Sequence, residues 1–249
     1  TQAKPTEPVD PNPDVAEVNG TKYKTLAAAI QAANGADITL LTIVSENVVV
    51  NDNSKAGVIL GNGATINAIP YPSNWVAEGR GIPLTMNAGE ITLKDGALAQ
   101  FNTSSNTNGA IALKGGTLTV ADTVTKIIGS ASYRQHAAIE ATGGVLDLQG
   151  NTLLDGGLTM SGDAQLKNKL TAGTFTNSGS ETYSVSVEGS TQYGAVFDLL
   201  EPGYAFAKYD ESAENKAGAI VDGSVKQLTE DVIVVAHTHS PKCTQNPDP

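Results

Sequence analysis

The sequence predicts an all-β protein, folded as a right-handed parallel β-helix with about 26–29 residues per coil, a short N-terminal capping helix and a β-rich C-terminal cap. Three observations lead to this prediction: a segment repeated three times, a period of two in its apolar residues, and glycines at a regular step. The three copies are residues 81–93, 109–120 and 137–148. The glycines are Gly63, Gly89, Gly116, Gly144 and Gly173, at steps of 26, 27, 28 and 29 residues. A fixed period in the twenties is typical of solenoid proteins.

Apolar residues alternate with small or polar ones on both sides of a glycine corner in each copy. Ile111 and Leu113 precede the corner, Leu118 and Val120 follow it, and the other two copies have the same spacing. A period of two places such side chains on one face of a strand. Each copy therefore predicts a strand, a glycine corner, a second strand and a return of variable length, with inward residues stacked on their counterparts one coil away. The Leu-x-x-Leu-x-Leu spacing of leucine-rich repeats is absent from these copies.

Composition excludes some classes of partner. The chain of 249 residues has a formal net charge of −11, which argues against binding to nucleic acid or to an anionic membrane surface. Cys243 is the single cysteine, so an internal disulfide is not possible. The sequence has no apolar run of membrane-spanning length and no signal peptide, and its first residue is not Met, which suggests a mature or excised fragment.

The N-terminal region predicts a linker followed by a cap. Residues 1–14 contain four prolines and predict a linker. Asn19-Gly20 predicts the turn of a hairpin within residues 15–23. Thr25 is the expected N-cap of a short helix whose apolar face is Leu26, Ile30 and Ala33, and Asn34-Gly35 is expected to end it. Strands are expected at residues 38–44 and 48–50. The amphipathic helix would cover the open end of the solenoid.

The β-helix with its N-terminal cap is expected to span residues 15–179. Residues 58–66 are the first predicted coil, with Gly63 at its corner. After Leu148 the spacing becomes irregular. The residues expected to point inward there are Leu153, Leu158, Met160, Leu166, Leu170 and Phe175.

Residues 180–236 change character and predict a C-terminal β cap or irregular last coils. Leu199 and Leu200 are expected to cover the end of the solenoid, and strands are expected at residues 204–209, 219–221 and 232–235. Residues 237–249 predict a tail or the start of a further module.

Three stretches resemble a known class of module. The N-terminal segment 18–41, the Gly-x-Ile-x-Leu-x-Gly-Gly-x-Leu-x-Val coils and the segment 199–210 resemble β-helix modules of large cell-surface and secreted proteins of Gram-positive gut bacteria, with a pectate-lyase-like solenoid architecture. The resemblance implies an extracellular, cell-wall or cell-surface location and a place in a larger multi-domain chain. Such modules sit beside others in adhesins and in secreted carbohydrate-active enzymes. The resemblance carries over no active-site motif.

The return loops contain the residues that best fit a ligand-binding site. Loops that enter the same stack of strands lie on one side of a solenoid, so their side chains would converge on one lateral surface. Aromatic faces pack on sugar rings, and Arg or His can donate hydrogen bonds to hydroxyls or carboxylates. The alternative is that the aromatic residues shield an exposed edge of the core and the cations only decorate the loops. The candidates are Tyr71, Trp75, Arg80, Tyr133, Arg134 and His136.

Acidic residues do not form a catalytic pattern in the sequence. Glu140 and Asp147 are expected on outward positions of adjacent strands. In the other coils, Thr85 and Ala112 correspond to Glu140, and Thr92 and Thr119 correspond to Asp147. A Ca²⁺-dependent lyase needs a cluster of carboxylates, and a glycosidase needs two at a set separation. Sequence alone does not place any two of Glu78, Glu140, Asp147 and Asp155 at the separation that a glycosidase needs. These acids are expected to be solvated surface groups, and no catalytic residue is predicted.

A weak metal candidate lies at the C-terminal end. His237, His239 and Cys243 are ligand types that suit zinc, and histidines two residues apart on an extended chain point the same way. The set lacks a fourth ligand, and neighbouring prolines favour a linker. No cofactor is predicted.

The sequence therefore favours a non-catalytic structural or adhesive module of an extracellular bacterial surface protein. Such a module could present a lateral face to a glycan or to a host or microbial surface protein. The alternative is an accessory or catalytic part of a polysaccharide-active enzyme, either a lyase or a glycosidase.

Overall fold

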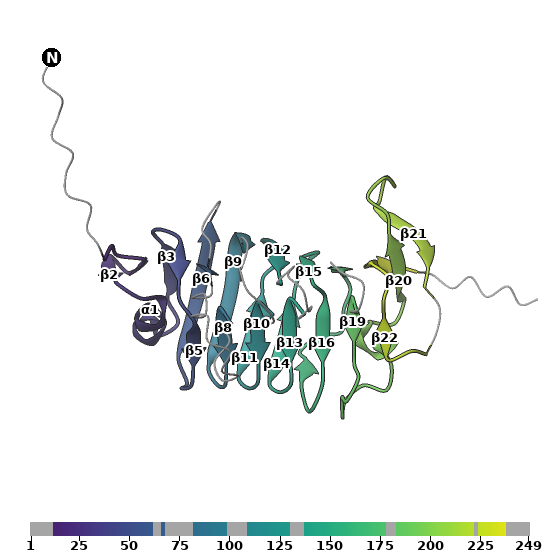
Figure 1. Cartoon of the computed structure of the whole chain (residues 1–249), viewed down its shortest axis with the longest axis horizontal. Coiled ribbons are helices and arrows are strands. Elements are labelled where there is room, and N and C mark those ends of the chain that lie inside the picture. Colours follow the sequence, from purple (N-terminus) through teal and green to yellow (C-terminus); the bar gives the residue numbers. More distant parts are fainter. Residues whose placement is uncertain are drawn as a thin grey trace, which may run out of the picture.

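The computed structural model describes residues 12–61, 66–67, 82–98, 109–129, 137–177, 183–221 and 224–237. Its strands follow one another along the long axis, from an N-terminal helix to a group of C-terminal strands (Figure 1). Within the described residues, α1 (Leu26–Ala33) is the one α-helix. The protein is mostly β, as the sequence predicts.

The described strands form three sheets. The fourteen-stranded sheet contains β1 (Ala16–Val18), β2 (Thr21–Tyr23), β3 (Asp37–Leu40), β6 (Lys55–Gly61), β9 (Glu90–Leu98), β11 (Thr117–Val120), β12 (Val124–Ile128), β14 (Val145–Leu148), β15 (Leu153–Asp155), β17 (Gln165–Leu166), β18 (Thr174–Thr176), β20 (Tyr204–Tyr209), β21 (Ala217–Ile220) and β23 (Val232–Ala236). The seven-stranded sheet contains β5 (Val48–Val50), β8 (Leu84–Met86), β10 (Ile111–Leu113), β13 (Ile139–Ala141), β16 (Leu158–Met160), β19 (Val185–Ser186) and β22 (Gln227–Leu228). The third sheet pairs β4 (Val44–Ser45) with β7 (Ile66–Asn67).

Repeated segments stack as parallel strands in register. Ile111 lies opposite Leu84 on one neighbouring strand and opposite Ile139 on the other. Leu118 lies opposite Ile91 and Leu146 in the same way. All of these side chains are buried. The predicted alignment of aliphatic residues from successive repeats is therefore confirmed.

Backbone approaches backbone closely at the corners between the two sheets. Gly89, Gly116 and Gly144 all have positive φ. A Cβ on Gly116 would lie 2.4 Å from the carbonyl oxygen of Gly89 and 2.6 Å from the carbonyl carbon of Ala88. Only glycine combines this φ with the space available, so the repeated glycine is required by the stacking of the corners.

Two of the predicted corner glycines do not belong to the row formed by Gly89, Gly116 and Gly144. Lys55 pairs with Glu90, so residues 51–54 are the counterpart of the Gly89 corner. Gly63 comes after that strand and lies outside the described residues. Gly173 precedes β18, whose Phe175 pairs with Leu154, and so does not belong to the row of corners. Both assignments were wrong because glycine marks many kinds of turn.

The length of a repeat also varies more than the sequence predicts. Ile139 pairs with Leu158 and Val48 pairs with Leu84, so one step is much shorter and one much longer than 26–29 residues. In the first corner, Asp52 Oδ1 accepts a hydrogen bond from Ser54 N, at 3.0 Å, and closes the turn without glycine. A constant period is therefore not needed for strands to stay in register.

The N-terminal predictions are confirmed in most details. Asn19 and Gly20 form the turn that joins β1 to β2. Thr25 Oγ1 accepts a hydrogen bond from Ala28 N, and Asn34 ends α1 in the left-handed conformation. The sequence did not reveal that the Glu46 carboxylate also accepts hydrogen bonds from the first two backbone N–H groups of α1, at 2.7 and 3.1 Å. Residues 38–44 form parts of two strands, β3 and β4, rather than one.

Helix α1 packs on the N-terminal strands through one apolar face. It contacts β1 and β6, among other strands. Its buried residues are Leu26, Ala29, Ile30 and Ala33, which include the three residues of the predicted face. The helix covers apolar side chains of the first strands, as a cap is expected to do.

Inward residues after Leu148 are partly as predicted. Leu158, Met160, Leu170 and Phe175 are buried. Leu153 and Leu166 are only half-buried, and Leu154 is the inward residue of β15. Sequence alternation could not decide between two adjacent leucines, because either fits a period of two.

Parallel stacking ends at the C-terminal strands. β23 pairs antiparallel with both β18 and β20, and β20 pairs antiparallel with β21. The apolar run before Leu200 forms a 3₁₀ helix, η1 (Val196–Leu199), and Leu199 and Leu200 are buried as predicted. The ring of Phe206 packs edge-on against two other rings, with centroid distances of 6.1 Å to Phe175 and 5.8 Å to Phe197. These rings join the C-terminal strands to the end of the stack.

We predict that alanine is tolerated much less at Gly116 than at Gly189. Both glycines have φ +74°, but a Cβ on Gly189 meets no atom within 4 Å. Gly189→Ala should lower the free energy of unfolding by about 1–2 kcal/mol, the cost of a left-handed residue. Gly116→Ala adds an overlap with backbone and should lower it by about 2–5 kcal/mol. Equal losses in urea titrations would contradict the close approach of the corners.

Candidate functional site

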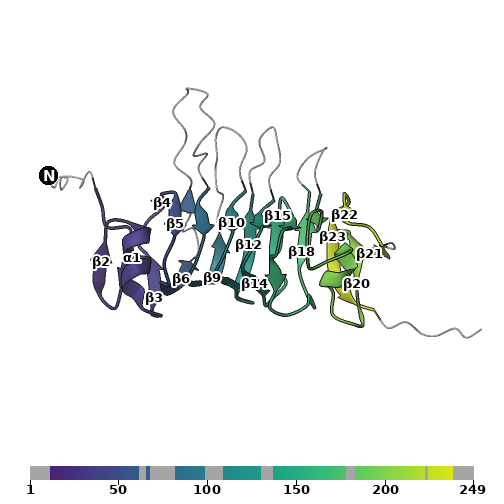
Figure 2. The ribbon, with the colours of Figure 1, turned by 90° about the horizontal axis from the view of Figure 1, so that it is seen from below.

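Several segments that connect the two large sheets start from one series of neighbouring strands and end on another. Residues 99–108 follow β9, residues 130–136 follow β12, and residues 178–182 follow β18, while β9, β12, β15 and β18 are consecutive neighbours in the large sheet (Figure 2). The next strands in the chain, β10, β13 and β19, belong to the consecutive series β8-β10-β13-β16-β19. The described ends of the connections therefore form two aligned rows.

The predicted ligand-binding residues belong to two of the connections that reach these rows. Tyr71, Trp75 and Arg80 precede β8, and Tyr133, Arg134 and His136 precede β13. All six lie outside the described residues. Their connections end on strands that both pair with β10, so the two ends lie about two strand spacings, or ~10 Å, apart. A shared binding surface stays a prediction, and the spacing of these ends is compatible with it.

Asp147 is the candidate acid whose environment the sequence misjudged. It points outward from β14, as expected, but its side chain is 1% exposed instead of solvated. Asp147 Oδ2 accepts hydrogen bonds from Gln149 Nε2 at 2.9 Å and Lys167 Nζ at 3.2 Å. Asp147 Oδ1 accepts one from Asn168 Nδ2 at 3.2 Å.

These donors determine the ionisation of Asp147. Burial raises the pKa of the carboxyl, but the hydrogen bonds from Gln149, Lys167 and Asn168, together with the charge of Lys167, outweigh burial and lower the pKa below its ordinary value of 3.8. A general acid needs the opposite shift, a raised pKa that keeps its proton near neutral pH. The site therefore fits a structural anion that ties β14 to the residues after β17.

The other candidate acids lie apart from an acidic row. Glu140 is opposite Ala112 on one side and Thr159 on the other, and Asp147 is opposite Thr119, so the predicted lack of an acidic ladder is confirmed at these positions. Asp155 forms an ion pair with Lys126 at 3.3 Å and accepts a hydrogen bond from Thr176 Oγ1. Glu78 lies outside the described residues.

Opposite charges also pair between strands of the large sheet. Lys55 meets Glu90 at 2.7 Å, and Lys94 meets Asp37 at 2.6 Å across β6. Gly57 makes the second contact possible, because a Cβ there would lie 2.3 Å from Asp37 Oδ1. Such exposed pairs contribute little to stability. They show that these charged side chains form ion pairs with one another.

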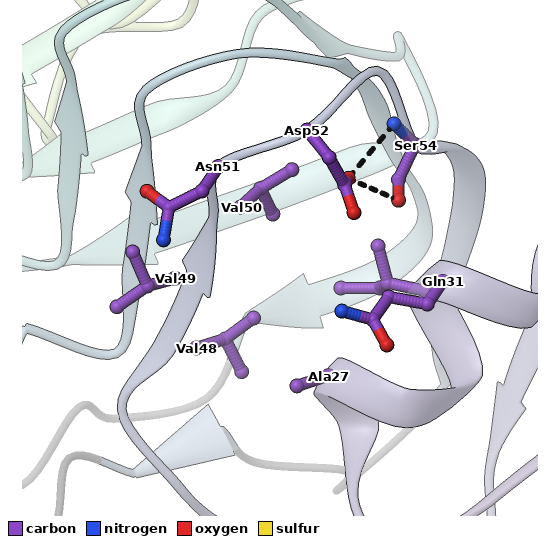
Figure 3. A pocket seen from close by; sticks show the side chains of 9 residues that line it. Ala27, Gln31, Val48, Val49, Val50, Asn51, Asp52 and Ser54 are labelled. Carbon is purple, nitrogen blue, oxygen red and sulfur yellow. Dashed lines mark hydrogen bonds between the residues drawn. The ribbon is translucent and has the colours of Figure 1, made fainter.

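A small pocket lies between α1 and β5. Its volume is about 70 Å³, and Figure 3 shows Ala27 and Gln31 of α1 facing the strand and the corner that follows it. The residues that line it are Ala27, Ile30, Gln31, Val48, Val49, Val50, Asn51, Asp52 and Ser54. Asp52 is turned toward Ser54, and the hydrogen bonds from the Ser54 hydroxyl and backbone N–H lower the pKa of its carboxyl. The pocket has room for little more than ordered water.

The zinc candidate falls mostly outside the described residues. His237 follows β23, whereas His239 and Cys243 are not described. In the described part of the chain, no three residues of the types His, Cys, Asp and Glu lie close enough together to hold a metal ion. The weak assignment to His237, His239 and Cys243 stays a prediction.

Two features of the described chain could not be found from motifs. The partners of Asp147 depend on the short step from β14 to β17, which the regular period did not anticipate. Only Gln149, two residues after Asp147 in the sequence, carries a local signal. The pocket depends on how α1 is placed against β5, which the sequence pattern does not determine.

The comparisons with known proteins add no relative. No protein-family model, no curated protein and no solved structure matches this chain. Among the described helices, none has the length and apolarity needed to cross a membrane.

We predict that the Asp147 carboxylate stabilises the fold in a pH-dependent way. Because its pKa is lowered in the folded state, its contribution is present above the pKa of the unfolded state and is lost as the pH falls through the folded-state pKa. At neutral pH, Asp147→Asn should lower the free energy of unfolding by about 1.5–3 kcal/mol. The difference from wild type should shrink in acid.

The exposed carboxylate Glu211 supplies the matched control. Glu211→Gln should change the free energy of unfolding by no more than about 0.5 kcal/mol at neutral pH. Denaturant titrations at several pH values give both quantities. A pH-independent loss in Asp147→Asn would contradict the role of the charge.

Proposed function

We propose that this chain is a non-catalytic structural or adhesive module of an extracellular bacterial surface protein, folded as a right-handed parallel β-helix. Consecutive repeats place parallel strands alternately in the two large sheets, which supports a wound chain. Crossovers between parallel strands are right-handed in about 98% of cases, and this supports the handedness. The resemblance of the repeats and of both end segments to cell-surface β-helix modules supports the location and the place in a larger chain.

The lateral edge of the stack is the surface proposed to meet a partner. The observation that carries this proposal is the alignment of the described ends of the connections along two rows of strands. Connecting segments tolerate variation while the scaffold stays fixed, so they are suited to binding. The aromatic and cationic side chains of segments 68–81 and 130–136 favour a glycan as the binding partner. A host or microbial surface protein is the other class of partner.

The described acids support a structural role over catalysis. Asp147 is held ionised by three donors, and Asp155 is engaged by Lys126 and Thr176. The environment of Asp147 lowers the pKa of its carboxyl, whereas acid catalysis at a glycosidic bond would require a raised one. We therefore place the recognition of a partner, rather than a reaction, at the lateral edge.

We predict that Trp75 contributes to glycan binding. On a glycan array, the wild-type chain should bind at least one class of sugar, and Trp75→Ala should weaken that binding by about 30-fold, as expected for a tryptophan at the centre of an interface. Ile220→Ala is the matched control, since Ile220 is an exposed apolar residue on β21, away from the aligned rows. Identical array profiles for wild type and Trp75→Ala would remove the proposed glycan surface.

A further inference from the structure

Two Asn-Gly pairs in the described chain form an almost matched comparison. Asn19 and Asn34 are both exposed, with φ of +48° and +46°. The glycines that follow them, Gly20 and Gly35, have φ of +80° and +89°. The dipeptide, the backbone φ angles and the exposure of the asparagine are therefore nearly the same at the two places.

The backbone N–H of the glycine distinguishes the two pairs. Gly35 N donates a hydrogen bond of 2.6 Å to the carbonyl oxygen of Lys55, which joins the end of α1 to β6. Gly20 N, at the tip of the β1–β2 hairpin, makes no hydrogen bond within the described part of the chain. A Cβ would meet no atom within 4 Å at either glycine, so the hydrogen bond, and not the surrounding space, separates the two pairs.

This nitrogen is the nucleophile in the spontaneous loss of ammonia from Asn-Gly. The glycine nitrogen gives its proton to solvent and attacks Cγ of the asparagine. A C–N bond forms, the Cγ–Nδ2 bond breaks, and Nδ2 leaves as ammonia. Water then opens the five-membered succinimide at one of its two carbonyls, which yields aspartate or isoaspartate.

We propose that Asn19 is a site of spontaneous deamidation and that the fold protects Asn34. Attack at Asn34 requires the hydrogen bond from Gly35 to Lys55 to open first, whereas Gly20 N is available in the folded state. Losing one backbone hydrogen bond corresponds to a rate at Asn34 about 2- to 10-fold lower than at Asn19.

The product has a structural consequence at the N-terminal edge of the large sheet. Isoaspartate adds one methylene to the backbone of a two-residue turn, and turn length sets the register of a hairpin. β2 is the edge strand and exposes Thr21 and Lys22, whereas β1 is also paired with β3. Modification of Asn19 should therefore release β2 and leave β1 in place.

The test follows both asparagines in one sample. The folded chain is aged in mildly alkaline buffer, and peptide mapping by mass spectrometry measures the conversion of amide to acid at Asn19 and Asn34. The proposal expects Asn19 to convert about 2- to 10-fold faster. Equal rates, faster conversion at Asn34, or conversion at neither site would overturn it.

Two controls assign the difference to the fold. In denaturant the two sites should convert at similar rates, and a difference that persists there would show that the hydrogen bond is not its cause. Asn19→Gly keeps the positive φ of the turn but has no side-chain amide. Hydrogen exchange in β2 should rise with age in wild type and stay constant in Asn19→Gly, whereas a rise in both would contradict the link to Asn19.

Discussion

The stacking of aliphatic side chains on parallel strands in register is the interaction on which the rest of this structure depends. Ile111 lies between Leu84 and Ile139, and Leu118 lies between Ile91 and Leu146. Each layer buries its apolar surface only against its neighbours, so no layer is stable alone. This dependence explains why α1 packs at one end of the stack and antiparallel strands with three phenylalanine rings at the other.

The corners and the outward positions follow from that stacking. Strands about 4.8 Å apart bring the corner backbones together, which leaves space only for glycine at Gly116. The stacking also brings outward side chains of successive strands close together, so a charged side chain lies beside its counterparts and is stabilised when one of them is an opposite charge or a hydrogen-bond donor. Asp147 finds Lys167 and Asn168 in this way, and Asp37 reaches Lys94 across Gly57.

The sequence predicted the centre of the stack well because periodicity is strongest there. Alternation around Ile91, Leu118 and Leu146 fixes which residues point inward, and equal spacing fixes which residues meet. It failed at Gly63 and Gly173, since a corner can also be closed by the Asp52 side chain and a glycine can serve another turn. The partners of Asp147 could not be predicted, because one shortened step brings Lys167 beside it. Trp75 and the other predicted ligand-binding residues lie outside the described residues, so their role stays a prediction that only experiment tests.

A double-mutant cycle on Leu118 and Leu146 tests the stacking most directly. These residues are opposite each other on β11 and β14, so the losses in unfolding free energy from Leu118→Ala and Leu146→Ala should be non-additive by about 0.5–3 kcal/mol. Leu118→Ala combined with Leu228→Ala, on the terminal strand of the other large sheet, should be additive within about 0.5 kcal/mol. Additivity in the first pair would contradict the stacking in register on which this account rests.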